Sequence, residues 1–471
     1  MKITRKTAVG ITLIVLIGLT SWGLAGALEE QKYIDLGKDE YNKGNYDAAI
    51  YFFNKAIELN PDNEYLYNDR GLCYVALGDT DLAISDFSKA IELNSDCVEA
   101  YYNRGLAHFN QGDWGIEEPF ELAIADYTKA IELKPDDADA YYNRGLAYNQ
   151  FVYYDPKPFS AEMNATYDKA LADFDKVLEL DPGYVLAHAA KGGAIYRYGD
   201  FDNATAEFNK ALDSVESILQ KSGGKGLAGV YASRARNYKA LTDYDTSIAD
   251  YNTAMELDPE LSDAISHQAD NYEIVEDWDK ALEMYDRMIV LMKNDPTYKW
   301  LYSKYYGKAD CYCQLGQYDE AMEMYDEAFT ECEKNQPDLL QRVYEHKGDC
   351  HCVFKEYDKA QEMYDKAAQE YAENRPDRLY MIYVKLGDLQ LELEEYDEAI
   401  VNYNKSIAEG KEDIYVADAY KGLGIAYKEL GETEKAKAAL ENAKSLYEEY
   451  GVDGHGKQEN IDECQKLLDE L

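Results

Sequence analysis

The sequence predicts an all-α solenoid of about eleven stacked helix-turn-helix units, and three observations support this. Residues 98–137 are restated closely from Ala138 onward, and such self-similarity is typical of stacked repeats. Within each copy, apolar or small residues recur at helical spacing in two short runs, which predicts two amphipathic helices. A turn such as Gly78-Asp79 separates the two runs. Because one pair cannot bury its apolar face alone, the copies must stack.

One small residue anchors the second predicted helix of each copy, and it sets the period. It recurs every 34 to 47 residues, at Ala49, Ala83, Ala123, Ala170, Ala204, Ser247, Ala281, Ala321, Ala360, Ala399 and Ala436. Pro61, Pro135, Pro182 and Pro259 close second helices, because proline cannot continue a helix. The copies together extend from about residue 30 to residue 450.

The repeated unit resembles the tetratricopeptide repeat, whose pattern spans about 34 residues. In the second copy the matching residues are Tyr67, Gly71, Tyr74, Ala83, Phe87 and Ala90. In the third copy they are Tyr101, Gly105, Ala123, Tyr127, Ala130 and Pro135. The resemblance implies a superhelix whose first helices line a concave groove that binds peptides or proteins.

Residues 1–28 do not belong to the array. Lys2, Arg5 and Lys6 precede a mostly apolar run from residue 8 to residue 28, which is typical of an export signal. The run is also long enough to span a bilayer, and this length favours an uncleaved membrane anchor. Alternatively, cleavage near Ala27 would release a secreted protein. In both cases the basic flank stays inside, so we expect the array outside the membrane.

The remaining chain divides at a glycine-rich stretch. Residues 216–227 contain Ser222-Gly223-Gly224 and are predicted to be a hinge linker between block 1 (30–215, copies one to five) and block 2 (228–450, copies six to eleven). Insertions are expected in the third copy, at 114–121, and in the fourth, at 151–164. A last helix within residues 451–471 is predicted to cap the stack.

The charge of the chain restricts its partners. Asp and Glu total 92 against 48 Lys and Arg, giving a net charge of -44 and making the protein strongly acidic. Nucleic-acid binding needs a basic face, so we exclude nucleic acid as a partner. The charge favours cationic partners or divalent ions, although a solvated, aggregation-resistant surface is the favoured interpretation.

Four copies share a charge pair. Arg70, Arg104, Arg144 and Arg234 each stand just before the first glycine, or its equivalent, of a copy, and the same copies carry Asp86, Asp126, Asp173 and Asp250. We predict that each arginine binds an aspartate across the helix pair, within its copy or with a neighbour. Such a pair is expected to specify stacking register more than to add stability, since desolvation offsets most of the attraction.

Cysteines and histidines cluster in copies eight and nine. Cys311 and Cys313 occupy the same places as Cys350 and Cys352, and His346 lies one turn before Cys350. Three alternatives stay open: apolar core residues, a disulfide between Cys311 and Cys350, or a metal site. Core packing is favoured, so no metal ligand and no cofactor is assigned.

The resemblance also identifies candidate groove residues, place by place. They are Tyr102, Asn103, Phe109, Tyr142, Asn143, Asn149, Tyr196, Arg236, His267, Asp270, Tyr306, Asp310, Glu345, His346, Asp349 and Asp388. One subset of the family clamps a carboxylate with lysines and asparagines. In this sequence those places are mostly tyrosine, asparagine or acidic residues. A protein or peptide segment that is basic or polar fits the later acidic places better.

These observations predict a non-catalytic scaffold that binds partners in its groove. The signal segment, the array and the cap account for the whole chain, and no hydrolase or dinucleotide motif is present, so we expect no enzymatic activity. Two alternatives remain: an accessory subunit of a membrane-bound enzyme or secretion complex, or a metal- or ligand-binding module at Cys311, His346 and Cys350. The oligomeric state is not predicted.

Overall fold

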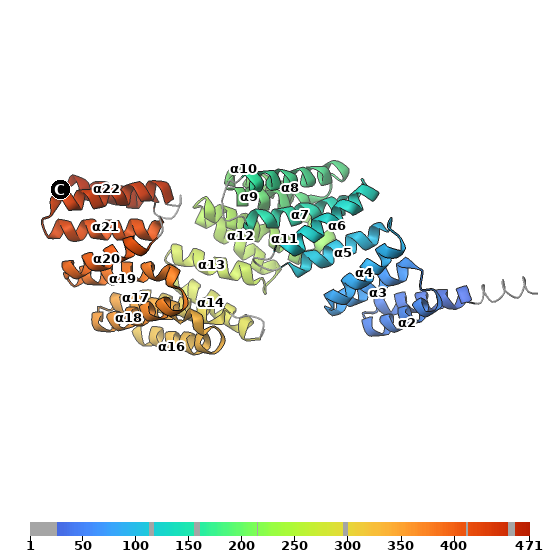
Figure 1. The fold of residues 1–471 in the computed structure, drawn as a ribbon, viewed down its shortest axis with the longest axis horizontal. Coiled ribbons are helices and arrows are strands. Elements are labelled where there is room, and N and C mark those ends of the chain that lie inside the picture. Colours follow the sequence, from blue (N-terminus) through green and yellow to red (C-terminus); the bar gives the residue numbers. More distant parts are fainter. Residues whose placement is uncertain are drawn as a thin grey trace, which may run out of the picture. The chain divides into compact units, whose positions relative to one another are not determined.

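The computed structural model describes residues 26–112, 117–154, 161–213, 215–294, 300–410, 413–450 and 457–471. Within these ranges every regular element is helical. The chain divides into two compact units, one ending at Lys221 and the other beginning at Ser222 (Figure 1). No helix in the described part combines the length and the apolar character needed to cross a bilayer. Of the predicted signal or anchor segment 1–28, residues 1–25 lie outside the described part.

The first unit holds five helix pairs. Residues 26–42 are helical and pair with the next helix along the chain. The others are α2 (Tyr46–Leu59), α3 (Glu64–Leu77), α4 (Thr80–Leu93), α5 (Val98–Gln111), α6 (Glu118–Leu133), α7 (Ala138–Tyr154), α8 (Ala161–Leu180), α9 (Val185–Tyr198) and α10 (Phe201–Leu212). Helices α7 and α8 extend into the predicted insertion at 151–164, and residues 155–160 lie outside the described part. Residues 114–116 of the other insertion also lie outside it.

The second unit continues the same pattern with six more pairs. Its helices are α11 (Val215–Ala240), α12 (Tyr244–Leu257), α13 (Ser262–Ile274), α14 (Trp278–Asn294), α15 (Leu301–Gln314), α16 (Tyr318–Asn335), α17 (Leu340–Val353), α18 (Tyr357–Asn374), α19 (Leu379–Glu392), α20 (Tyr396–Glu409), α21 (Ile414–Glu429), α22 (Thr433–Tyr450) and α23 (Lys457–Asp469). Two 3-10 turns, η1 (Pro337–Leu339) and η2 (Pro376–Arg378), precede α17 and α19. The last helix, α23, buries Cys464 against Ala443 and Tyr447 of α22.

The segment expected to be a linker is largely helical. Residues 215–240 form α11, which is broken at Gly223, where φ is 66° and ψ is -167°. Only glycine adopts this backbone region readily, so the break is encoded by one residue rather than by a long flexible stretch. The division between the two units falls next to it.

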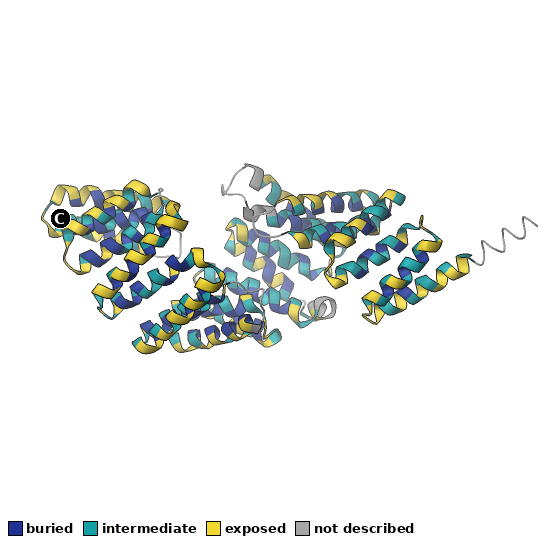
Figure 2. Cartoon of the chain, turned by 60° about the horizontal axis from the view of Figure 1, so that its bottom comes forward, coloured by how far each residue is buried: buried dark blue, intermediate teal, exposed yellow. Residues whose placement is uncertain are grey.

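The small anchor residues lie where helices approach most closely. All ten anchor alanines and Ser247 have no solvent exposure. Four places along from the anchor, an aromatic ring fills the groove of the first helix, as Phe87 does against Gly71 and Tyr364 does against Gly348. Each helix therefore has one buried side and one exposed side (Figure 2).

Successive first helices also touch one another. In the first unit α3 contacts α5, α5 contacts α7 and α7 contacts α9. In the second unit α15 contacts α17 and α19 contacts α21. The first helices of each unit thus form one layer, and this layer carries the candidate site.

Candidate partner-binding groove

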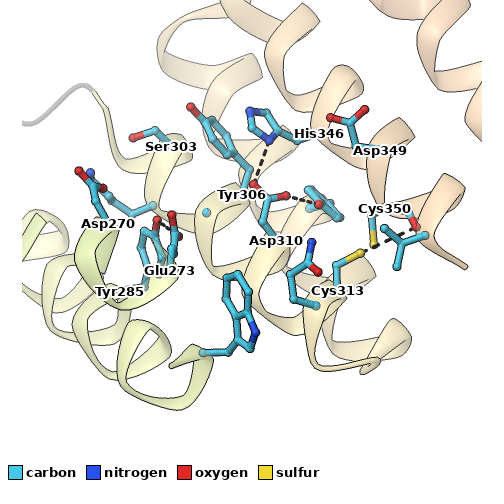
Figure 3. A pocket seen from close by; sticks show the side chains of 16 residues that line it. Asp270, Glu273, Tyr285, Ser303, Tyr306, Asp310, Cys313, His346, Asp349 and Cys350 are labelled. Carbon is cyan, nitrogen blue, oxygen red and sulfur yellow. Dashed lines mark hydrogen bonds and ion pairs between the residues drawn. The ribbon is translucent and has the colours of Figure 1, made fainter. Parts of the chain in front are cut away.

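The first helices of copies seven, eight and nine enclose a hollow in the second unit (Figure 3). Its volume is about 480 Å³, and its wall comes mainly from α13, α15 and α17. The lining residues are Asp270, Glu273, Trp278, Tyr285, Ser303, Lys304, Tyr306, Gly307, Asp310, Cys313, Gln314, Tyr325, His346, Asp349, Cys350 and Val353. Two further hollows adjoin it. One shares Ser303, Lys304 and Tyr306 with it, and the other shares His346.

An aspartate and a histidine pair at the centre of this wall. The Nδ1 atom of His346 lies 2.9 Å from an Asp310 carboxylate oxygen, and the ring of Tyr306 stacks on the imidazole with centroids 4.3 Å apart (Figure 3). Burial opposes the charged imidazole, but the carboxylate of Asp310 outweighs it and raises the pKa of His346. The site therefore favours a protonated histidine between two first helices.

Glu273 and Lys304 lie at the other side of the hollow. The hydroxyl of Tyr285 donates to the Glu273 carboxylate at 2.6 Å, and Lys304 donates to the Ser266 hydroxyl at 3.0 Å. Burial raises the pKa of Glu273 and lowers the pKa of Lys304, in each case because it disfavours the charged form. The hollow thus contains polar groups that only partly satisfy one another.

A row of aspartates runs along the first-helix layer. Asp310, Asp349 and Asp388 hold the same place in copies eight, nine and ten, and each accepts a hydrogen bond from the buried tyrosine of its own second helix. The distances are 2.6 Å from Tyr364 to Asp349 and 2.7 Å from Tyr403 to Asp388. Each bond fixes one carboxylate oxygen, so the row presents carboxylates at regular spacing along the layer.

The structure brings several candidate groove residues of the second unit together. Asp270, Tyr306, Asp310, His346 and Asp349 line the large hollow, and Glu345 lines the adjoining one. Arg236 forms an ion pair with Asp263, and His267 lies 3.4 Å from Asp263 and 3.5 Å from Asp270. Asp388 lies farther along the row of aspartates.

The candidate residues of the first unit are occupied with one another or with neighbouring side chains. Asn143 donates to the Tyr102 hydroxyl at 2.9 Å, and Asn103 donates to Asn68 at 2.9 Å. The rings of Phe109, Tyr142 and Tyr196 pack edgewise or tilted against Phe120, Phe174 and Phe201. Asn149 is buried, and its backbone carbonyl accepts from Arg197 at 2.9 Å. These residues therefore serve the stacking of the repeats as well as facing the groove side.

Sequence reasoning missed Ser303, Lys304 and Arg342, which line the hollows. Ser303 and Arg342 occupy the same position of the repeat on the first helices of copies eight and nine, and Asp263 occupies that position in copy seven. This register was available from the repeat alignment, but these residues differ in chemistry from copy to copy. A place without a recurring residue type gives no signal until the helices are seen together.

The predicted arginine–aspartate pairs are confirmed, and each forms within its own copy. The guanidinium donates twice, at 2.6–2.9 Å, from Arg70 to Asp86, from Arg104 to Asp126, from Arg144 to Asp173 and from Arg234 to Asp250. A third donor reaches back to the preceding copy. Arg104 binds Ser88 at 3.0 Å and Arg144 binds Thr128 at 3.1 Å.

The cysteine cluster is a packing feature. All eight cysteines are free thiols, seven of them are buried, and Cys311 and Cys350 are not joined. Cys313, rather than Cys311, lies next to Cys350, with its sulfur 3.8 Å from the Cys350 carbonyl. Among the described residues, no three His, Cys, Asp or Glu side chains lie close enough together to hold a metal ion. The disulfide and metal alternatives are therefore not supported.

Paired helices, buried small anchors and a polar first-helix layer define a class of helical repeat proteins. The chain belongs to the tetratricopeptide repeat family. Three family models match it: a TPR repeat at residues 37–78, 71–112 and 119–150, and two tetratricopeptide repeat models, one at 164–217 and the other at 228–261, 305–335, 382–408 and 417–450. Together these matches cover more than half of the chain.

Several solved structures are similar to parts of the chain. A crystal structure of MamA is 28% identical, with a TM-score of 0.34, over 41% of this chain and 96% of that one. A tetratricopeptide repeat protein from Parabacteroides merdae is 17% identical, with a TM-score of 0.47, over 63% of this chain and 99% of that one. Yeast Tom70 is 17% identical, with a TM-score of 0.44, over 94% of this chain and 96% of that one.

Proposed function

We propose that this protein is a non-catalytic scaffold that binds a protein or peptide segment along the first-helix layer of its second unit. The observation that supports this most is the run of three adjoining hollows. Each of Tyr306, Arg342 and His346 lines a different two of these hollows. A run of connected hollows on successive helices suits an extended segment that contacts several copies at once. The family's repeat architecture commonly presents such surfaces for binding.

The charge of this layer supports a partner segment that is basic overall. Asp270, Asp310, Asp349 and Asp388 recur at one place on four first helices, within a chain of net charge -44. Complementary charge accelerates encounter and excludes acidic competitors. Some of these aspartates have internal cations, for example Asp349 with Lys385 at 3.0 Å, so the attraction acts mainly through the field of the whole layer.

A pull-down from detergent extracts of the native source tests this function. The Ser303→Arg variant places a long side chain where two hollows meet, and the Thr330→Arg control adds the same side chain on the exposed side of a second helix. We expect the wild type and the control to retain the same stoichiometric partner, and the Ser303→Arg variant to lose it. Equal retention by all three, or retention of no partner by the wild type, would contradict the proposal.

The partner retained from the same extracts also distinguishes an independent scaffold from an accessory subunit. An enzyme or a secretion component as the retained partner would favour an accessory subunit of a membrane-bound complex. Turnover of a small substrate by the purified chain alone would contradict a non-catalytic role.

We also propose that residues 1–28 direct the array to the outside of a membrane, as an anchor or as a signal cleaved near Ala27. The basic start and the apolar run that follows support this. In intact cells, an externally added protease should digest the array, while carbonate extraction should leave it in the membrane fraction if the segment is uncleaved. Protection from protease in intact cells, with digestion after lysis, would refute the location.

A further inference from the structure

The adjoining hollow at the junction of copies nine and ten has an unusual charge. It has a volume of about 210 Å³ and is lined by Arg342 of α17, by Arg375 just after α18 and by Arg378 of η2. We call it the arginine pocket. Glu345 is the one carboxylate in its lining, and it already accepts a hydrogen bond from Tyr371 at 3.1 Å. Arg375 also forms an ion pair, at 3.5 Å, with Asp377, which does not line the pocket.

Three guanidinium groups around one small hollow are unexpected in this protein. The chain has 92 acidic residues against 48 Lys and Arg, and a cation on its surface usually finds a carboxylate, as Lys347 finds Asp326. Because His346, whose pKa is raised by Asp310, also lines this hollow, its wall holds an excess of positive charge. Like charges brought together repel one another, so a bound anion would stabilise the arrangement.

A buried amide in the same wall is unpartnered. Gln341 is only 1% exposed, lines the arginine pocket, and its Oε1 atom is buried without a hydrogen-bond donor. An unsatisfied buried acceptor is costly and rare in native proteins. A backbone N–H of a peptide bound in the pocket would supply the missing donor.

We infer that the arginine pocket binds the anionic side chain of one residue in the partner segment, a carboxylate or a phosphate. The planar guanidinium fork matches both groups geometrically, and the arginines come from α17 and from the segment between α18 and α19, so they can approach the anion from two sides. The N–H of that residue or of its neighbour would donate to Gln341. This inference rests on the proposed function, because the pocket opens into the same groove through His346 and Arg342.

The pocket gives the partner a charge pattern. Elsewhere in the groove the row of aspartates repels an acidic residue, whereas here an acidic residue is attracted. A segment that is basic overall and has one acidic anchor satisfies both conditions, and a uniformly basic segment satisfies only one. Attraction at one place combined with repulsion at the others fixes the register of the segment.

Selection from a library of random dodecapeptides displayed with both ends blocked by carrier protein tests this inference. The full chain is used as wild type, as the double variant Arg342→Gln/Arg378→Gln, and as the control Arg287→Gln, whose guanidinium binds the Pro259 carbonyl away from the hollows. We expect peptides selected by the wild type and the control to be enriched in Asp or Glu at one position. The double variant should select peptides without that enrichment.

The outcomes separate the two proposals. Selected peptides without an acidic preference, or a preference unchanged in the double variant, would overturn the inference and leave the proposed function intact. A wild type that selects no peptide would contradict both. Circular dichroism of each variant shows that the helices are retained, which is expected because Arg342 and Arg378 are exposed.

A synthetic copy of one selected peptide distinguishes the two anions. Replacing its Asp or Glu by Asn or Gln should weaken binding by about tenfold, as for a charge-assisted hydrogen bond that is lost. The same peptide with phosphoserine at that position should bind more tightly than the carboxylate if phosphate is the natural group, and less tightly if the pocket is sized for a carboxylate. Equal binding of the neutral peptide would refute the inference.

Discussion

At the scale of the residue, Arg104 ties three helices together. Its guanidinium donates twice to Asp126 of the next helix and once to Ser88 of the preceding copy. The carboxylate of Asp126 is only 7% exposed, so removing the arginine leaves a nearly buried charge without its partner. The pair therefore acts as a device for register, and its energetic value appears mainly when one member is missing.

We predict that Arg104→Met destabilises the third copy by about 3 kcal/mol, because breaking a buried pair costs that much. Replacing both members, as Arg104→Met/Asp126→Met, should recover most of the loss. Hydrogen exchange of peptides from residues 98–133 measures the local effect. A double variant as unprotected as the single one would show that the pair itself, rather than the orphaned charge, provides the stability.

His346 makes a residue-scale contribution that depends on pH. Its pKa is raised in the folded chain, since Asp310 outweighs burial, and Glu345 and Asp349 act in the same direction. A raised folded pKa gives stability that is fully present below the unfolded value of about 6.5 and is lost as the pH rises through the folded value. We predict that His346→Gln removes this part of the pH dependence, measured as urea midpoints from pH 5.5 to 8.5. An identical profile for wild type and variant would refute the prediction.

At the scale of the element, a first helix meets its second helix through a glycine or alanine and an aromatic ring. A Cβ added at Gly348 would lie 2.5 Å from a ring carbon of Tyr364, too close for any real contact. The hydroxyl of the same tyrosine binds Asp349, so the ring cannot move away without losing that bond. Packing and hydrogen bonding thus restrain one side chain together.

Two glycine substitutions in the second unit should therefore act in opposite directions. Gly348→Ala is expected to destabilise the unit by about 1–3 kcal/mol through overpacking. Gly229→Ala, where an added Cβ meets nothing within 4 Å in helix α11, is expected to stabilise by about 0.5–1 kcal/mol. Thermal unfolding followed by circular dichroism measures both. A Gly348→Ala protein as stable as the wild type would show that the ring does adjust.

Element-scale features were the most predictable from the sequence. Recurring residues gave the eleven helix pairs, the buried anchors and the arginine–aspartate pairs, because a repeated residue type reports a repeated environment. The tyrosine–aspartate bonds of copies eight to ten were not predicted. The tyrosines and the aspartates each recur from copy to copy, but neither recurrence by itself indicates that the two side chains meet. Lys304, Arg342 and the arginine pocket depend on residues that occur once, so only the packing of three elements shows them together.

At the scale of the whole molecule, Gly223 divides the chain. We propose that residues 216–227 act as a hinge, because a backbone conformation suited to glycine interrupts α11 there. Trypsin acting on the native protein is expected to cut first after Lys221 or Lys225 and to release two resistant fragments, identified by mass spectrometry. The variant Lys221→Gln/Lys225→Gln should resist this first cut. First cleavage inside either array would contradict the hinge.

Most joints between neighbouring copies share one polar contact, and the last two joints differ. The residue that reaches back to the preceding second helix is Arg104, Arg144, Lys191, Gln268, Lys308 or Lys347, depending on the copy. In copies ten and eleven it is a leucine. Leu386 is buried in an apolar cluster with Tyr364 and Ala367, and Leu423 is buried in one with Ala399 and Tyr403. Concentrated sulfate should consequently weaken the ionic joints by screening and strengthen these two apolar joints, so the arginine pocket would lie beside one of the joints that are most stable at high salt.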